Sequence, residues 1–290
     1  MNNWDVEFRL EEDASAARVI ITGNWIGDMK DAHRLLVDVC HRWPAGYKVK
    51  YLVTCGGFIQ FPWPLAPATG KRGHLVPNCV STLVTTALRC CGSLLDDDLL
   101  RKLRDRTGCL TLGADSQEEL GNQRRPHIEL VTVLDLQRHE WYWTGKSYPT
   151  VSQEGGLIRI TDLQTHFLDL EGERVMVLGC HDLNIFSPRA RATTRNEWRR
   201  KIREDMLSLT KKNKPTHVLQ HPHKTDSEKT WKTAFSGLRK SVPSVREFLS
   251  AGRWYRENNR GLPEEPRSPL EKVLETTKVG KTIDIIVWRR

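Results

Sequence analysis

The chain has 290 residues, 38% of them hydrophobic and ten of them tryptophan, which excludes extensive disorder and suits one large α/β domain or two small ones. No apolar run approaches the ~18 to 20 residues of a membrane span, and the first residues lack the order of a signal peptide, so we expect a cytoplasmic protein without membrane association. A formal charge of +9 fits an anionic partner such as nucleic acid.

The seven cysteines point to reduced thiols. They are odd in number and contain no CxxC pair, which argues against a disulfide framework and a structural zinc site. The sequence also lacks a GxGxxG dinucleotide fingerprint. We therefore expect no cofactor and no metal.

The first elements alternate between strand and helix. Ala17–Thr22 and Val49–Cys55 read as strands, and Asp28–Arg42 reads as a helix with its apolar residues on one face. The second strand ends at Gly56-Gly57, and a proline-rich connection from Phe58 to Pro67 follows, which no helix or central strand would tolerate. That connection either lines the mouth of a pocket or is a surface loop held by its own aromatic side chains.

The middle of the chain predicts two helices and then three strands. The second helix opens with Ser93 as its N-cap. The last two strands are adjacent, and Lys146 follows them directly. These elements are Cys79–Cys90 and Ser93–Arg106 as helices, and Cys109–Gly113, Ile128–Leu136 and His139–Thr144 as strands.

A buried-strand pattern then ends at a cysteine. The hairpin signal Glu171-Gly172-Glu173 precedes four apolar residues, Val175 to Leu178, which are followed by Gly179 and Cys180. Gly179 removes a side chain that would crowd the approach to Cys180. A cysteine at a strand end, with Lys146 from a neighbouring strand, is how a thiol nucleophile for acyl transfer is built. Free cysteines in strands are more often inert packing.

The chain becomes basic after this cysteine. Arg189 to Lys214 carries ten Lys or Arg, and its apolar residues Trp198, Ile202, Met206 and Leu209 fall at helical spacing. The charged side of this helix is either a solvated face or a patch for nucleic acid. A final strand is predicted at Thr282–Trp288.

These elements, in this order, resemble the carbon–nitrogen hydrolases of the nitrilase superfamily from about Arg18 to Val287. IELVTVLDLQRHEWYWTGKSYPT resembles the strand pair that precedes the catalytic lysine, which would be Lys146. GERVMVLGCHDLNIFSPRARA resembles the nucleophile segment, which would make Cys180 the nucleophile. Glu154 lies where many members have an additional active-site glutamate. The resemblance implies an α/β fold, an α-β-β-α sandwich of two packed mixed sheets flanked by helices.

The resemblance also implies an organisation for the whole chain. It predicts a single domain over residues 1–290 with a variable C-terminal part from about residue 255. It favours a homo-oligomer, a dimer or a larger assembly. The substrate would be a small-molecule amide or nitrile, whose identity the sequence does not give.

One element of the family is missing. The general base of the family is a glutamate at the end of the second strand, where this chain has Gly56 and Gly57, and no Asp or Glu occurs from Val39 to Leu95. The candidates for a substitute base are His181, His221, His223 and, among the acids, Glu154. Strand alternation would turn His181 away from Cys180.

Three hypotheses therefore stand side by side, and enzyme activity stays an open question. The first is an amide or nitrile hydrolase in which Cys180 attacks, Lys146 stabilises the oxyanion and the general base is non-standard or absent. The second is a catalytically inactive binding or regulatory protein of nitrilase-like fold. The third is a basic nucleic-acid-associated factor that uses the helix within Arg189 to Lys214.

Overall fold

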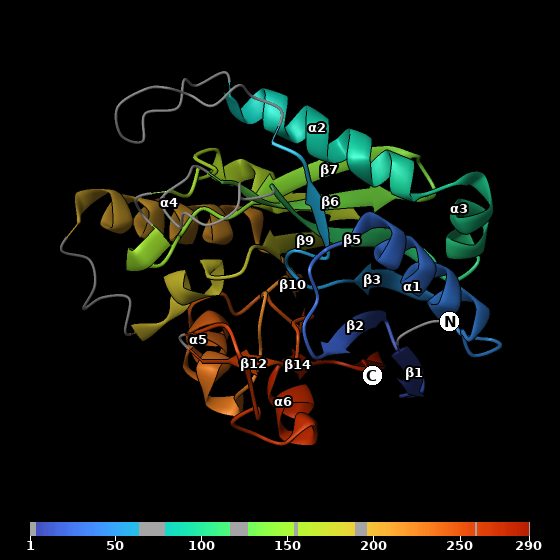
Figure 1. Cartoon of the computed structure of the whole chain (residues 1–290). Helices are drawn as coiled ribbons and strands as arrows, with labels where there is room; N and C mark the ends of the chain where they lie inside the picture. Colours follow the sequence, from blue (N-terminus) through green and yellow to red (C-terminus); the bar gives the residue numbers. More distant parts are fainter. Residues whose placement is uncertain are drawn as a thin grey trace.

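The computed structural model describes residues 4–63, 79–116, 127–153, 156–188, 196–258 and 260–289. Two β-sheets pack face to face, and helices cover the outer face of each sheet (Figure 1). The α-β-β-α sandwich predicted from the sequence is confirmed. Among the helices so described, none is long and apolar enough to cross a membrane.

Within these residues, the larger sheet has the strand order β1-β15-β2-β3-β5-β6-β7, and β4 pairs with β5. Strand β2 lies parallel to both of its neighbours and is buried along its whole length, which explains its almost continuous apolar run. The bounds are Trp4–Arg9 (β1), Ala16–Thr22 (β2), Val49–Val53 (β3), Ile59–Phe61 (β4), Thr107–Ser116 (β5), Glu129–Asp135 (β6), Glu140–Gly145 (β7) and Thr282–Arg289 (β15).

The smaller sheet has the order β14-β11-β10-β9-β8. Strands β9 and β10 are parallel, while β8 returns to β9 through the hairpin predicted at Glu171-Gly172, where both residues have a positive φ. The bounds are Phe167–Leu170 (β8), Glu173–Leu178 (β9), His217–Gln220 (β10), Glu247–Ser250 (β11) and Lys278–Val279 (β14). A separate short pair joins Arg256–Glu257 (β12) to Pro263–Glu264 (β13).

Apolar side chains of both sheets fill the space between them. Tyr51 and Val133 of the larger sheet belong to the same buried cluster as Val177 and Leu219 of the smaller one. This cluster fixes the two sheets against each other. The carboxyl end of β9, where Cys180 follows, is thereby held close to the ends of β5 and β7.

Helices α1, α2 and α3 pack on the larger sheet, and α4 and α5 pack on the smaller one (Figure 1). Helix α6 lies against α5 and packs its Leu270 and Leu274 on Ile20 of β2 and Ile286 of β15. The bounds are Met29–His41 (α1), Cys79–Leu94 (α2), Asp97–Arg104 (α3), Glu197–Asn213 (α4), Glu228–Ser241 (α5) and Leu270–Thr276 (α6).

One local prediction was wrong. Helix α2 runs on to Leu94, and the N-cap of the next helix is Asp96, whose carboxylate accepts a hydrogen bond from the N–H of Leu99, so Ser93 is not a cap. Ile59–Phe61 forms a short strand that pairs with β5 alone, before the first proline of the connection, which is compatible with the expectation of no helix or central strand there. The rest of that connection, residues 64–78, lies outside the described residues.

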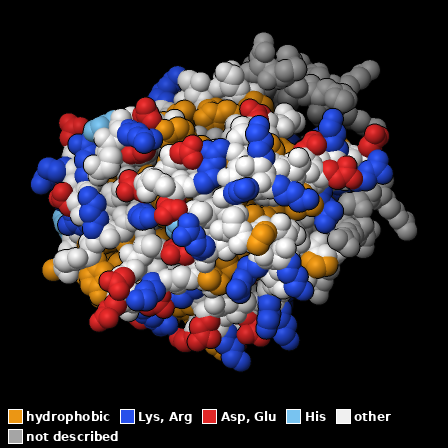
Figure 2. Space-filling view, turned by 180° about the vertical axis from the view of Figure 1, so that it is seen from behind, with side chains coloured by type: hydrophobic (Ala, Val, Ile, Leu, Met, Phe, Trp, Pro, Cys, Tyr) orange, Lys and Arg blue, Asp and Glu red, His pale blue; other side chains and the backbone are white. Residues whose placement is uncertain are grey.

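The basic helix differs from its prediction in one important residue. Arg199 of α4 is buried beside Ile202 and Met206; its guanidinium donates to the carbonyl of Pro149 at 2.7 Å and lies over the ring of Tyr148. It is therefore part of the protein interior rather than of a charged face. On the face drawn in Figure 2, acidic side chains lie among the lysines and arginines, so the charge there is mixed.

Candidate active site

Cys180 lies in a turn at the carboxyl end of β9. The strand ends at Leu178, and a 3₁₀ helix begins at Asp182. The thiol is almost completely buried. Because the chain leaves the extended conformation after Leu178, strand alternation does not apply to His181, and its side chain lines the same cavity as Cys180.

Gly179 is required by the backbone of Lys146. A Cβ atom at this position would lie 3.2 Å from both the N and the Cα of Lys146 and 3.0 Å from a carboxylate oxygen of Asp182. The room that the glycine leaves is thus filled by the lysine segment, whereas the sequence suggested open access to the thiol. The close approach brings the ends of β7 and β9 together.

Asp182 holds the two segments in register. Its fully buried carboxylate accepts hydrogen bonds from the N–H groups of Ser147 (2.9 Å), Tyr148 (2.7 Å) and Gly179 (3.0 Å). Burial raises the pKa of this carboxyl, although these backbone donors and the charge of Lys146 oppose the shift. One side chain therefore fixes the position of Lys146 relative to Cys180.

Lys146 is a buried cation with defined partners. Its Nζ lies 2.9 and 2.8 Å from the two carboxylate oxygens of Glu129 and 2.8 Å from Oε1 of Gln153. Burial alone would lower the pKa of Lys146, but the negative charges of Cys180 and Glu129 raise it. The ammonium group is therefore charged, and it lines the cavity of Cys180.

His223 contacts the cysteine from the loop after β10. Its backbone N–H donates to Sγ of Cys180 at 3.4 Å. Its ring Nε2 lies 2.5 Å from a carboxylate oxygen of Asp115, and Nδ1 lies 3.7 Å from a carboxylate oxygen of Glu129. Two acidic residues of the larger sheet thus hold one imidazole beside the thiol.

The other predicted candidates for a base are placed differently. The ring of His181 packs against Trp231 and interacts with the side chain of Asn184 at 3.2 Å. His221 is fully buried, its Nδ1 donates to the carbonyl of Thr54 at 2.8 Å, and burial lowers its pKa to about 4. His221 is not among the residues that line the cavity of Cys180. Glu154 lies outside the described residues.

The thiol of Cys180 differs electrostatically from the other cysteines whose side chains the structure describes. Burial alone would raise its pKa, but the imidazoles of His181 and His223 hold that pKa well below the usual value of a thiol. For Cys40 and Cys55, burial raises the pKa to about 11. Cys180 is thus poised as a thiolate, the reactive form of the side chain.

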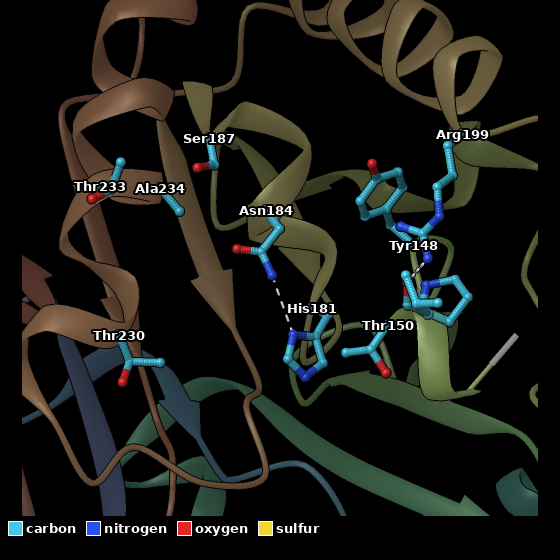
Figure 3. A pocket seen from close by; sticks show the side chains of 11 residues that line it. Tyr148, Thr150, His181, Asn184, Ser187, Arg199, Thr230, Thr233 and Ala234 are labelled. Carbon is cyan, nitrogen blue, oxygen red and sulfur yellow. Dashed lines mark hydrogen bonds between the residues drawn. The ribbon is translucent and has the colours of Figure 1, made fainter. Parts of the chain in front are cut away.

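These groups share a polar cavity of about 750 Å³. A side cavity of about 220 Å³ adjoins it, and the two have His181 and Thr230 in common. In Figure 3, the ring of His181 lies below Asn184 and beside Thr150, and Arg199 lies next to Tyr148. The arrangement offers a nucleophile, a buried cation and an imidazole–carboxylate pair to one bound molecule.

Two of these residues, Asp115 and Glu129, were missed in the sequence. Asp115 is the last residue but one of β5, and Glu129 is the first residue of β6, and both strands are buried along almost their whole length. A carboxylate in such a position is buried only when it is paired, and this was the signal that could have revealed them.

One group in the described part of the chain has the composition of a metal site. The donor atoms of Cys109, Asp135 and Glu171 lie within 4.8 Å of one another. One carboxylate oxygen of Asp135 already accepts the N–H groups of Gln137 and Arg138. The group lies at the Thr107 end of β5, whereas Asp115 is near the other end of that strand, so it has no part in the cavity of Cys180.

Solved structures of a bacterial amidase have the same architecture. An amidase from Nesterenkonia sp. superposes with a TM-score of 0.51 at 12% identity, over 97% of this chain and 92% of that chain. A cysteine-to-serine mutant of the Nesterenkonia AN1 amidase, from the nitrilase superfamily, gives 0.51 at 12% identity over 96% and 92%. A cysteine-to-alanine mutant in complex with butyramide gives 0.51 at 12% identity over 97% and 93%.

The chain therefore has the fold of the carbon–nitrogen hydrolases, and the resemblance seen in the sequence is confirmed at the level of the fold. No protein-family model matches the sequence, and no curated protein matches it either. At 12% identity the likeness concerns the fold alone.

Proposed function

We propose that this protein hydrolyses the carbon–nitrogen bond of a small amide, with Cys180 as the nucleophile. The observation that carries the proposal is the meeting of a thiol poised as thiolate with the Lys146–Glu129 pair in one cavity. Ionisable groups with perturbed pKa values that converge in a cavity are typical of catalytic sites. A cysteine that only packs in the core would not need such neighbours.

The proposed reaction begins with attack of the Cys180 thiolate on the amide carbon. The carbonyl oxygen becomes an oxyanion, which the ammonium group of Lys146 stabilises. Glu129 and Gln153 hold that ammonium in place, so little reorganisation is needed as charge develops. Loss of the amine leaves a thioester, and water then hydrolyses the thioester and releases the carboxylic acid.

The structural neighbours support an amide as the substrate class. Mutants of the Nesterenkonia amidase have been crystallised with butyramide and with acrylamide. The cavity of about 750 Å³ in this chain has ample room for molecules of that size. Small aliphatic amides are therefore the first substrates to test, followed by larger ones.

Ammonia release from butyramide and longer amides is the direct test. We expect Cys180→Ala to abolish it, whereas Cys90→Ala, which removes a partly exposed thiol outside the site, should leave the rate unchanged. A wild-type protein that hydrolyses none of a broad amide panel, although iodoacetamide labels Cys180 rapidly, would instead be an inactive binding protein of this fold.

A further inference from the structure

At Gly56 and Gly57, where the resemblance places the family's general base, neighbouring residues occupy the space that a side chain would need. A Cβ atom on Gly56 would lie 2.7 Å from the carbonyl oxygen of His221 and 3.2 Å from Nδ1 of His223. A Cβ atom on Gly57 would lie 2.9 Å from a carboxylate oxygen of Asp115. The two glycines therefore leave room for an imidazole that reaches the site from a different strand.

That imidazole is fixed in one orientation. Asp115 holds Nε2 of His223 at 2.5 Å, so Nδ1 is the ring nitrogen left for proton exchange. Nδ1 of His223 lies 3.7 Å from a carboxylate oxygen of Glu129, and the backbone N–H of His223 donates to Sγ of Cys180. His223 is thus tied both to the nucleophile and to the acids of the larger sheet.

We propose that His223, oriented by Asp115, carries the proton between Cys180 and the leaving amine, the role that the family resemblance assigns to the missing glutamate. This inference rests on the proposed amide hydrolysis and names its acid–base residue. The constellation is a cysteine–histidine–aspartate relay built on a nitrilase-like fold.

The reaction starts from the Cys180 thiolate and the His223 imidazolium, because the thiol proton already lies on His223. The thiolate attacks the amide carbon and forms the C–S bond. As the C–N bond breaks, Nδ1–H donates its proton to the leaving nitrogen, and the amine departs neutral. Nδ1 then accepts a proton from the water that attacks the thioester. The C–S bond breaks, and the thiolate–imidazolium pair is restored.

The charges around His223 agree with this role. The titratable and charged groups around it, within the described residues, include Asp115 on β5, Glu129 on β6, Cys180 after β9, the buried thiol of Cys55 after β3, and Arg253, which donates to the His223 carbonyl. Burial alone would lower the pKa of His223, but the charges of Asp115 and Glu129 raise it well above its usual value. The pair therefore rests as thiolate and imidazolium.

Neither of the other two histidines offers the same combination. The Nδ1 of His221 donates to the carbonyl of Thr54, and His221 does not line the cavity. His181 also lowers the pKa of Cys180, through its charge and a side-chain hydrogen bond, but its Nδ1 is paired with the amide of Asn184, and no ion pair with a carboxylate is found for it among the described residues. A carboxylate partner helps an imidazole to hold a proton at neutral pH, and His223 has one in Asp115 at 2.5 Å.

The test is the rate of Cys180 alkylation by iodoacetamide from pH 5 to 10, followed by mass spectrometry of the Cys180 peptide. The proteins compared are the wild type, His223→Gln, Asp115→Asn, His181→Gln and the surface control His41→Gln. We expect His223→Gln to move the profile to higher pH and Asp115→Asn to slow alkylation at pH 6 to 7. Thermal unfolding of each variant checks that it is folded.

The second measurement is butyramide hydrolysis across the same pH range. His223→Gln should lose about 10²- to 10⁴-fold in kcat, at least tenfold more than His181→Gln. Asp115→Asn should move the alkaline limb of the profile to lower pH, because that limb reports loss of the His223 proton. An unchanged alkaline limb, or equal losses in both histidine variants, would overturn the relay.

The two experiments separate this inference from the proposed function. If alkylation depends on His223 and Asp115 but the protein hydrolyses no amide, the thiolate–imidazolium pair is supported. Its role in amide hydrolysis and the proposed function are then both rejected. If the protein hydrolyses amides but neither variant changes the alkylation profile, the proposed function is supported and the relay is rejected.

Discussion

Asp115 on β5 and Glu129 on β6 are direct partners in the antiparallel register of the larger sheet, so their carboxylates project from the same face. Like charges at directly opposed positions destabilise a sheet unless cations compensate them. Here His223 pairs with Asp115, and Lys146 pairs with Glu129. The two acids thereby gather both cations of the proposed mechanism at the edge of one cavity.

Glu129→Gln should leave the ammonium of Lys146 buried without its anion. Removing one partner of a buried ion pair costs about 3 to 5 kcal/mol, so we expect a fall of that order in the free energy of unfolding. The rate of amide hydrolysis should fall as well, because Lys146 is no longer held. Urea denaturation and kcat/KM measure the two effects.

The matched control is Glu140→Gln, which neutralises an exposed acid on β7. It should change the free energy of unfolding by less than about 0.5 kcal/mol. If Glu129→Gln behaved like this control in stability and rate, the Lys146–Glu129 pair would be irrelevant to both.

Gly179→Ala tests the close approach of β9 to the lysine segment. The new methyl group would lie 3.2 Å from the backbone of Lys146, so the two segments must separate, at a cost of about 1 to 3 kcal/mol. Separation should also slow hydrolysis. In the control Gly92→Ala, the Cβ on helix α2 meets nothing within 4 Å and should stabilise the protein by about 0.5 to 1 kcal/mol. The same gain at position 179 would exclude the crowding.

Much of the fold could be predicted because apolar periodicity reports burial directly. The run Val175 to Leu178 and the strand Ala16–Thr22 are apolar because both of their faces are covered, and both were found from that pattern. The boundary between α2 and α3 was missed because Ser93 and Asp96 are both good caps. Packing of Leu94 and Leu95 into the core selects Asp96.

The candidate site was only partly predictable for a geometric reason. Cys180 and Lys146 lie in local motifs, and local motifs can be read in one dimension. Asp115, Glu129 and His223 become neighbours only through the register of β5 with β6 and the packing of one sheet on the other. Sequence spacing alone does not carry that information, so His223 could not be chosen over His181 and His221.

His221 predicts a loss of stability in acid. Burial lowers its pKa to about 4 in the folded protein, whereas in the unfolded chain it is about 6.5. Between these values the unfolded state binds the additional proton, so stability falls as the pH falls through this window. From pH 7 to pH 5 the loss attributable to His221 is about 2 kcal/mol.

Urea denaturation at the two pH values measures this slope. His221→Asn can still donate a hydrogen bond to the carbonyl of Thr54 but cannot titrate, so its slope should be smaller by about 2 kcal/mol. His41→Asn removes a histidine at the exposed end of α1 and should keep the wild-type slope. An identical pH dependence in wild type and His221→Asn would mean that this histidine is accessible to protons in the folded state.

Asp182→Asn tests the clamp that the Asp182 carboxylate forms between the segment of Lys146 and the segment of Cys180. One oxygen of the amide can still accept from Ser147 and Tyr148, but the NH₂ group then faces the N–H of Gly179, and a buried donor is left without an acceptor. The expected cost is about 1 to 3 kcal/mol in the free energy of unfolding. Because the clamp sets the distance from Lys146 to Cys180, kcat should fall more than KM rises. Asp169→Asn, which removes an exposed charge on β8, should change neither quantity, and a purely structural role for Asp182 would leave kcat of the folded variant at the wild-type value.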